Sequence, residues 1–121
     1  MKLLFLIIFA LFCQTSLWAK STTMLFLGDS LTEGLGVNEF QSFPRLIEKK
    51  LKDKNHDVFI INGGISGSTS ASGVSRLNWH AKRNIDILVL ELGANDGLRG
   101  LKITETEMNL KKIVNLAKNK K

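Results

Sequence analysis

The chain has 121 residues, with 17 lysines and arginines against 11 acidic residues and a formal net charge of +6. This length suits one domain at most, and the excess of positive charge is modest. The lysines gather on the polar faces of expected helices and no aromatic side chains interleave with them, so the charge favours a solvated surface over a nucleic-acid-binding site.

The first 19 residues have the order of a secretory signal peptide, with a positive start, an apolar run at 3–12 and a small residue, Ala19, at the end. The apolar run is too short to span a bilayer, which needs about 20 residues. We expect cleavage after Ala19, which leaves residues 20–121 as a periplasmic or secreted domain with no stable membrane anchor. The alternative is a buried N-terminal helix or strand. The only cysteine, Cys13, lies in the leader, so the mature chain would have no disulfide and no thiolate metal site.

The remainder of the chain alternates apolar strands with amphipathic helices. In chain order, the expected elements are a strand at 23–27, a helix capped by Ser42 with Pro44 in its first turn, a strand at 58–61, a weaker helix at 71–82, a strand at 85–92, a glycine-rich loop at 93–100, and a helix that starts with Thr104 and Glu107 as a capping box. Each helix has apolar side chains at helical spacing on one side, so each is expected to cover a sheet.

This order of elements predicts a parallel sheet with helices on both faces, which is an α/β three-layer sandwich of flavodoxin-like topology. Right-handed crossovers with the strand order 2-1-3 place the first strand between the other two. The third strand would then have no neighbour on its outer side, although its apolar sequence is that of an interior strand.

Polar, glycine-rich segments follow all three expected strands. They are residues 28–31 (GDSL), 62–67 (NGGISG) and 93–97 (GANDG). Each alone is an ordinary turn sequence. The carboxyl ends of parallel strands share one edge of the sheet, so the three segments are expected to converge there. Their convergence predicts a functional site rather than three unrelated turns.

These segments resemble the first three sequence blocks of the GDSL/SGNH serine hydrolases: GDSL at 28–31, ISG at 65–67 and ELGANDGLRG at 91–100. The resemblance covers the mature chain and is closest to the bacterial periplasmic thioesterase I, lysophospholipase L1 and arylesterase group. It implies that Ser30 is the nucleophile. It also implies that the backbone N–H groups of Ser30 and Gly67, with the side-chain amide of Asn95, form the oxyanion hole.

By the same resemblance the reaction is the hydrolysis of carboxylic esters or thioesters, such as aryl esters, acyl-CoA and lysophospholipids, through a serine acyl-enzyme. The partner would be a small-molecule acyl ester or thioester, and no metal or cofactor would take part. The residue types suit this chemistry, because acyl transfer needs a hydroxyl nucleophile and N–H donors aimed at the developing oxyanion.

The base of the family and its orienting acid belong to a later Asp-x-x-His segment, for which this sequence has no match. His56 and His80 precede the second and third strands, so we expect both at the amino ends of the strands, as surface or helix-end histidines. A strand of five or six residues is roughly 17–20 Å long, which keeps both histidines away from Ser30.

The resemblance therefore implies a domain truncated after its third strand–helix unit and inactive alone. Two other interpretations stay open. One is a non-catalytic remnant or acyl-ligand binder that keeps the oxyanion hole. The other is a phosphate-binding module that uses the same glycine-rich loops, although the sequence has no lysine loop of the P-loop type.

The leader sequence gives a first prediction. Protein recovered from the periplasm or the medium should begin at or near Lys20, because the signal peptidase cuts after a small residue that follows the apolar run. N-terminal sequencing checks this, and soluble protein that retains Met1 would contradict it.

Overall fold

The structure is a computed structural model that describes residues 20–119, so the expected leader at 1–19 lies outside it. The elements in chain order are β1 (Thr22–Gly28), α2 (Ser30–Glu33), a 3₁₀ turn (Glu39–Gln41), α3 (Phe43–Asp53), β2 (Val58–Gly64), a second 3₁₀ turn (Ser70–Ser72), α4 (Gly73–His80), β3 (Ile87–Glu91), α5 (Ala94–Leu98) and α6 (Ile103–Lys118). None of the helices in this part of the chain is long and apolar enough to cross a bilayer.

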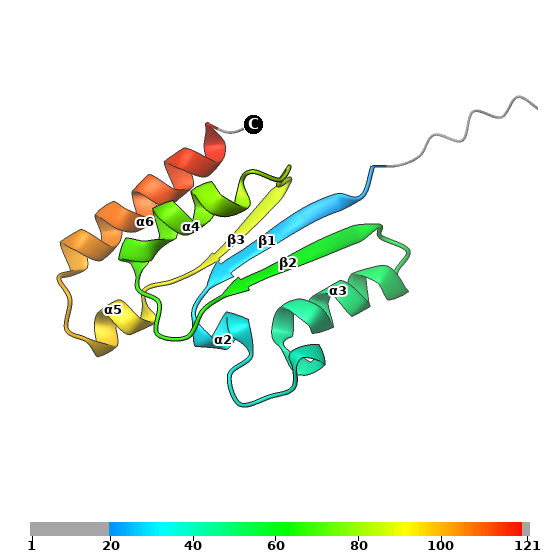
Figure 1. The fold of residues 1–121 in the computed structure, drawn as a ribbon, viewed down its shortest axis with the longest axis horizontal. Coiled ribbons are helices and arrows are strands. Elements are labelled where there is room, and N and C mark those ends of the chain that lie inside the picture. Colours follow the sequence, from blue (N-terminus) through cyan, green and yellow to red (C-terminus); the bar gives the residue numbers. More distant parts are fainter. Residues whose placement is uncertain (1–19, 120–121) are drawn as a thin grey trace, which may run out of the picture.

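The three strands form one parallel sheet in the order β2-β1-β3, which confirms the predicted order. The register sets Gly28 of β1 beside Gly64 of β2 and beside Glu91 of β3. All three strands therefore end in one row. The segments that follow them, with the short helices α2 and α5, lie together at this edge of the sheet (Figure 1).

Helices cover both faces of the sheet and complete the three predicted layers (Figure 1). On one face α4 and α6 pack side by side over an apolar core that consists of Leu25, Leu27, Ile61, Leu77 and Ile113. On the other face lies α3, where the ring of Phe43 packs edge-to-face on Phe26 with centroids 5.6 Å apart. Alternate residues of β1 thus supply both cores, because successive strand residues point to opposite faces.

Some local expectations are wrong. The 93–100 segment contains the helix α5, which the glycine-rich sequence concealed. The expected capping box does not form, since α6 begins at Ile103 and the N-cap position belongs to Lys102. The first turn of α6 is instead tied to α5, because the Thr106 hydroxyl donates to the Asp96 carboxylate (3.1 Å). Ser42 does occupy the N-cap position of α3, but its hydroxyl donates backwards to the Glu39 carbonyl oxygen (2.8 Å).

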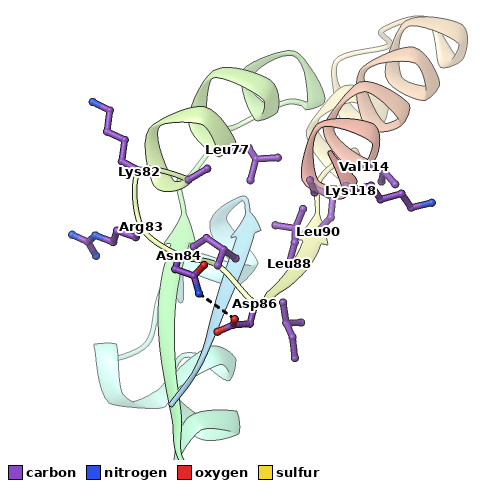
Figure 2. A pocket seen from close by; sticks show the side chains of 13 residues that line it. Leu77, Lys82, Arg83, Asn84, Asp86, Leu88, Leu90, Val114 and Lys118 are labelled. Carbon is purple, nitrogen blue, oxygen red and sulfur yellow. Dashed lines mark hydrogen bonds between the residues drawn. The ribbon is translucent and has the colours of Figure 1, made fainter. Parts of the chain in front are cut away.

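The outer edge of β3 has no strand beside it within residues 20–119. A groove of about 630 Å³ runs along this edge, between the C-terminal ends of α4 and α6 (Figure 2). Its wall includes Leu77, Leu88, Leu90 and Val114, and the labelled Lys82, Arg83 and Lys118 point outward from it. The groove is lined by β3 from Ile87 to Leu90, and none of Ser30, Gly67 and Asn95 lines it.

The contact between α6 and the sheet gives a prediction for stability. Ile113 is fully buried in the core, so Ile113→Ala should lower the free energy of unfolding by about 2–5 kcal/mol through lost burial and the cavity left behind. The exposed neighbour Lys112 provides the control, since Lys112→Ala should change the free energy of unfolding by about 0.5 kcal/mol or less. Urea unfolding of both variants measures the difference, and equal losses would contradict the position of α6.

Candidate active site

Ser30 is the first residue of α2, directly beyond the end of β1. The preceding residue, Asp29, caps this helix, because its Oδ1 accepts the N–H of Leu31 (3.0 Å). Glu91 at the end of β3 holds the same turn: its Oε2 accepts the Thr32 hydroxyl (2.7 Å) and the Asp29 N–H (3.3 Å). The hydroxyl and N–H of Ser30 have no hydrogen-bond partner within residues 20–119. Both groups are therefore available to a ligand.

Asn95 lies where the three segments meet. Its Nδ2 donates to Asp29 Oδ2 (3.2 Å) and to the Ser68 carbonyl oxygen (3.0 Å), so its amide lies beside the Ser30 turn and beside the segment that holds Gly67. The N–H of Gly67 has no partner in the described part of the chain. The structure thus brings Ser30, Gly67 and Asn95 to one edge of the sheet. Both amide hydrogens of Asn95 are engaged, so a substrate oxygen would have to replace one of these partners.

The close packing of α2 on β2 depends on a glycine. A Cβ on Gly64 would lie 2.0 Å from the backbone nitrogen of Glu33, so any larger residue there would push α2 away from the sheet. Helix α2 and the segment after β2 can therefore approach each other only because position 64 has no side chain.

The position expected for His80 is wrong. Its Nε2 lies 3.2 Å from where a Cβ on Gly63 would be, so the half-buried imidazole lies near the carboxyl end of β2. The reason is length, because the eight residues of α4 extend only about 12 Å and cannot reach back along the whole sheet. Gly63 and Gly64 face opposite sides of β2, so the strand separates His80 from α2 and its first residue, Ser30.

The two histidines also differ in environment. His56 is exposed just before β2, at the amino end of the sheet as expected. Burial holds the pKa of His80 below its ordinary value, and the positive charges of Arg76 and Arg83 lower it further. Both effects favour the neutral form of the His80 imidazole. Neither histidine is placed to take a proton from Ser30.

Arg76 lies beside the candidate site and was not predicted from the sequence. Its Nη2 donates to the carbonyl oxygen of Gly28 (2.9 Å) and to that of Gly63, which joins the ends of β1 and β2. Burial lowers the pKa of Arg76, and the nearby negative charge of Asp29 partly offsets this. Arg76 stays charged, as arginines in proteins do.

A buried network fixes the residue next to Asn95. Asp96 is 2% exposed, and its carboxylate accepts the N–H of Ser70 (2.8 Å), the Ser70 hydroxyl (2.5 Å) and the Thr106 hydroxyl (3.1 Å). Asn109 of α6 donates to Ser70 Oγ (3.1 Å). Burial raises the pKa of Asp96, but the hydrogen bonds from Ser70 and Thr106 outweigh it, and the pKa lies below its ordinary value. The network holds α5, and with it Asn95, against α6 and the turn before α4.

A parallel α/β sheet with a free serine hydroxyl and converging N–H donors at its carboxyl edge is an arrangement suited to hydrolases that act through a serine. Comparison with known proteins gives the family. Residues 26–121 match the GDSL-like lipase/acylhydrolase family, and the chain belongs to it. This confirms the resemblance found in the sequence.

The chain is similar to proteins that are named as esterases or thioesterases. An arylesterase of Vibrio mimicus is 39% identical over 119 residues, which cover 98% of this chain and 58% of that protein. Thioesterase 1/protease 1/lysophospholipase L1 of Escherichia coli K12 is 39% identical over 97 residues, with coverage of 79% and 45%. The crystal structure of AlinE4, an SGNH-hydrolase family esterase, is 34% identical with a TM-score of 0.80 and coverage of 85% and 56%. The chain thus spans about half the length of the curated relatives it matches.

The buried carboxylate of Asp96 gives a pH-dependent prediction. Its depressed folded-state pKa stabilises the fold above the unfolded pKa of about 3.9, and this contribution is lost as the pH falls through the folded pKa. Asp96→Asn replaces one acceptor oxygen by an NH₂ group that faces the same donors. It should lower the free energy of unfolding by about 1–3 kcal/mol at pH 7. The difference from wild type should shrink at pH 3.

Urea unfolding at the two pH values measures this difference. The exposed Asp53→Asn serves as the control, because that carboxylate pairs only with exposed Lys49 and should contribute little at either pH. A loss for Asp96→Asn that is the same at both pH values would contradict the network.

Proposed function

We propose that this chain carries the nucleophile and the oxyanion hole of an exported serine hydrolase that cleaves carboxylic esters or thioesters. One observation carries the proposal. The hydroxyl of Ser30 lies at the same sheet edge as the N–H groups of Ser30 and Gly67 and the amide of Asn95, and within residues 20–119 the hydroxyl and both N–H groups have no hydrogen-bond partner. These are the groups that acyl transfer requires. Membership of the GDSL-like lipase/acylhydrolase family supports it.

In the proposed reaction, Ser30 Oγ attacks the carbonyl carbon of the ester or thioester while a base takes its proton. The carbonyl oxygen becomes an oxyanion that accepts hydrogen bonds from the N–H groups of Ser30 and Gly67 and from Asn95. Collapse of the tetrahedral intermediate expels the alcohol or thiol, which recovers the proton, and water then hydrolyses the acyl-serine. One donor of this kind contributes about 3 kcal/mol to transition-state stabilisation.

The base is proposed to come from outside residues 20–119. Exposed His56 lies at the amino end of the sheet, and His80 lies across β2 from α2. The family resemblance implies a histidine of an Asp-x-x-His segment for this role. The free edge of β3 and the apolar groove beside it offer a place for further protein to pack. Without a base a serine hydroxyl is a weak nucleophile, so residues 20–119 by themselves would be a poor catalyst.

The proposed substrate has an apolar acyl or aryl part. Each of the three segments that carry the proposed catalytic groups also has an exposed large apolar side chain: Leu31 is 67% exposed, Ile65 52% and Leu98 85%. Exposed apolar groups on the same segments as the polar catalytic groups suit an ester with an apolar substituent. The names of the arylesterase and of the thioesterase/lysophospholipase relatives agree with this class.

The proposal also includes the location of the protein and a second candidate function. Export to the periplasm or beyond is supported by the signal-peptide order of residues 1–19. The second candidate, an acyl-ligand binder without turnover, is favoured by the engaged amide of Asn95 and by the positions of the two histidines. A hydrolysis assay separates the two, because only the enzyme releases alcohol or thiol.

The nucleophile gives the central activity prediction. In the whole gene product, Ser30→Ala should lower the turnover of a short-chain aryl ester by about 10⁶-fold, as removal of a nucleophile does in other serine hydrolases. Ser75→Ala is the matched control and should stay at the wild-type rate, because Ser75 is an exposed serine of α4 whose hydroxyl bonds only to the Ser72 carbonyl.

Release of the aryl alcohol, followed by absorbance, measures both variants. Ser30→Ala activity within tenfold of wild type would reject Ser30 as the nucleophile. A wild-type protein that binds the ester without hydrolysing it would favour the binder.

A further inference from the structure

We propose that Glu33 and Arg99 are positioning residues that orient the N–H of Gly67 towards the substrate oxygen. We call this pair the Glu33–Arg99 clamp. The inference rests on the proposed function, and it adds two residues from opposite sides of the site to the groups already described. It follows from how the segment 66–68 is held in space.

Glu33 holds the segment from the side of the nucleophile. Its Oε2 accepts the backbone N–H of Ser66 (2.7 Å) and also the Ser66 hydroxyl. Glu33 is the last residue of α2, and Ser30 is the first. The same short helix therefore carries the nucleophile at one end and a carboxylate that binds the oxyanion segment at the other.

Arg99 holds the segment from the side of α5. Its Nη2 donates to the carbonyl oxygen of Gly67 (2.8 Å). The next residue along, Ser68, has its carbonyl oxygen bound to Nδ2 of Asn95 (3.0 Å). Three consecutive residues of the segment are thus bound by side chains from α2, from α5 and from the residue directly after α5.

The peptide that matters is the one between Ser66 and Gly67, because it carries the N–H of Gly67. Glu33 fixes the peptide before it through the Ser66 N–H, and Arg99 fixes the peptide after it through the Gly67 carbonyl. The middle peptide has no hydrogen bond from its N–H within residues 20–119. It is therefore held from both sides while its donor stays free for a ligand.

Gly67 needs this support more than another residue would. Its φ is +76°, a conformation that glycine adopts at low cost but does not hold by itself. An oxyanion donor acts only if it is preorganised to within about 0.5 Å of its working position. The charge that it stabilises develops in the transition state, so disorder of the segment lowers kcat rather than raising KM.

The test uses the whole gene product and compares Glu33→Ala and Arg99→Ala with Ser30→Ala in steady-state hydrolysis of an aryl ester. Complete loss of an oxyanion donor costs about 100- to 1000-fold in kcat, so loosening one should cost on the order of 10-fold or more with KM little changed. Glu33→Gln keeps an oxygen acceptor for Ser66 and Arg99→Lys keeps a donor for Gly67, so both should restore part of kcat.

Glu105→Ala and Lys49→Ala are the matched controls, because these side chains are exposed and their ion pairs are with Lys102 and Asp53 rather than with segment 66–68. The clamp is overturned if kcat stays within about twofold of wild type in both alanine variants, if only KM changes, or if the controls lose as much. If an alanine variant does not fold, the Glu33→Gln and Arg99→Lys variants replace it. A partial loss of kcat in them supports the clamp, and an unchanged kcat overturns it. Retained activity in Ser30→Ala would instead overturn the proposed function, and this result is distinguishable from all the others.

Discussion

The register of the parallel sheet, which ends β1, β2 and β3 beside one another at Gly28, Gly64 and Glu91, is the constraint on which the site depends. Interstrand hydrogen bonds fix this row, so the chain leaves the sheet at one edge three times. Ser30, Gly67 and Asn95 belong to these three exits. Glu91 then connects the end of β3 to the turn that carries Ser30, since its carboxylate accepts hydrogen bonds from Asp29 and Thr32. A shift of one strand by one residue would turn its side chains to the other face and separate these groups.

Buried polar groups make the second level of organisation. Burying a charge is costly unless hydrogen bonds replace its water. Asp96 accepts three hydrogen bonds from Ser70 and Thr106, and its lowered pKa follows from them. Arg76 is less well supplied, because its Nε and Nη1 are buried without a partner in the described part of the chain. The carbonyls of Gly28 and Gly63 that it binds lie at the ends of β1 and β2, shortly before Ser30 and Gly67, so this half-buried cation helps to hold both segments in place.

Much of this arrangement follows from the sequence. The apolar runs identify β1, β2 and β3, and right-handed crossovers with helices on both faces of the sheet are consistent with the order in which β1 lies between the other two. The polar segments after the strands converge for the same reason. What the sequence could not provide is where side chains reach across the chain. The capping box at Thr104 does not form because α6 already begins at Ile103, and the first turn is held instead by Thr106 on Asp96, a tertiary contact between α6 and α5.

His80 and Glu33 are two further residues whose positions the sequence pattern did not predict. The expected place of His80 is wrong because it assumed that a residue just before β3 lies at the amino end, whereas α4 is too short for this. Glu33 sits in a turn sequence that carries no signal of its own. Its contact with Ser66 exists only because α2 packs on β2 over Gly64, where a Cβ would not fit. Positions that depend on two packed elements are the ones that local patterns miss.

The central claim is that Ser30 is a nucleophile activated in an oxyanion site, and covalent labelling tests it most directly. An alkylphosphonate aryl ester forms a stable tetrahedral adduct only with a serine that can attack it, so the whole gene product would be incubated with this reagent, digested and mapped by mass spectrometry. The account predicts one modified peptide, with the adduct on Ser30, and none in Ser30→Ala. An adduct on another serine, such as Ser66 or Ser70, or ester hydrolysis that continues with Ser30 unmodified, would contradict it.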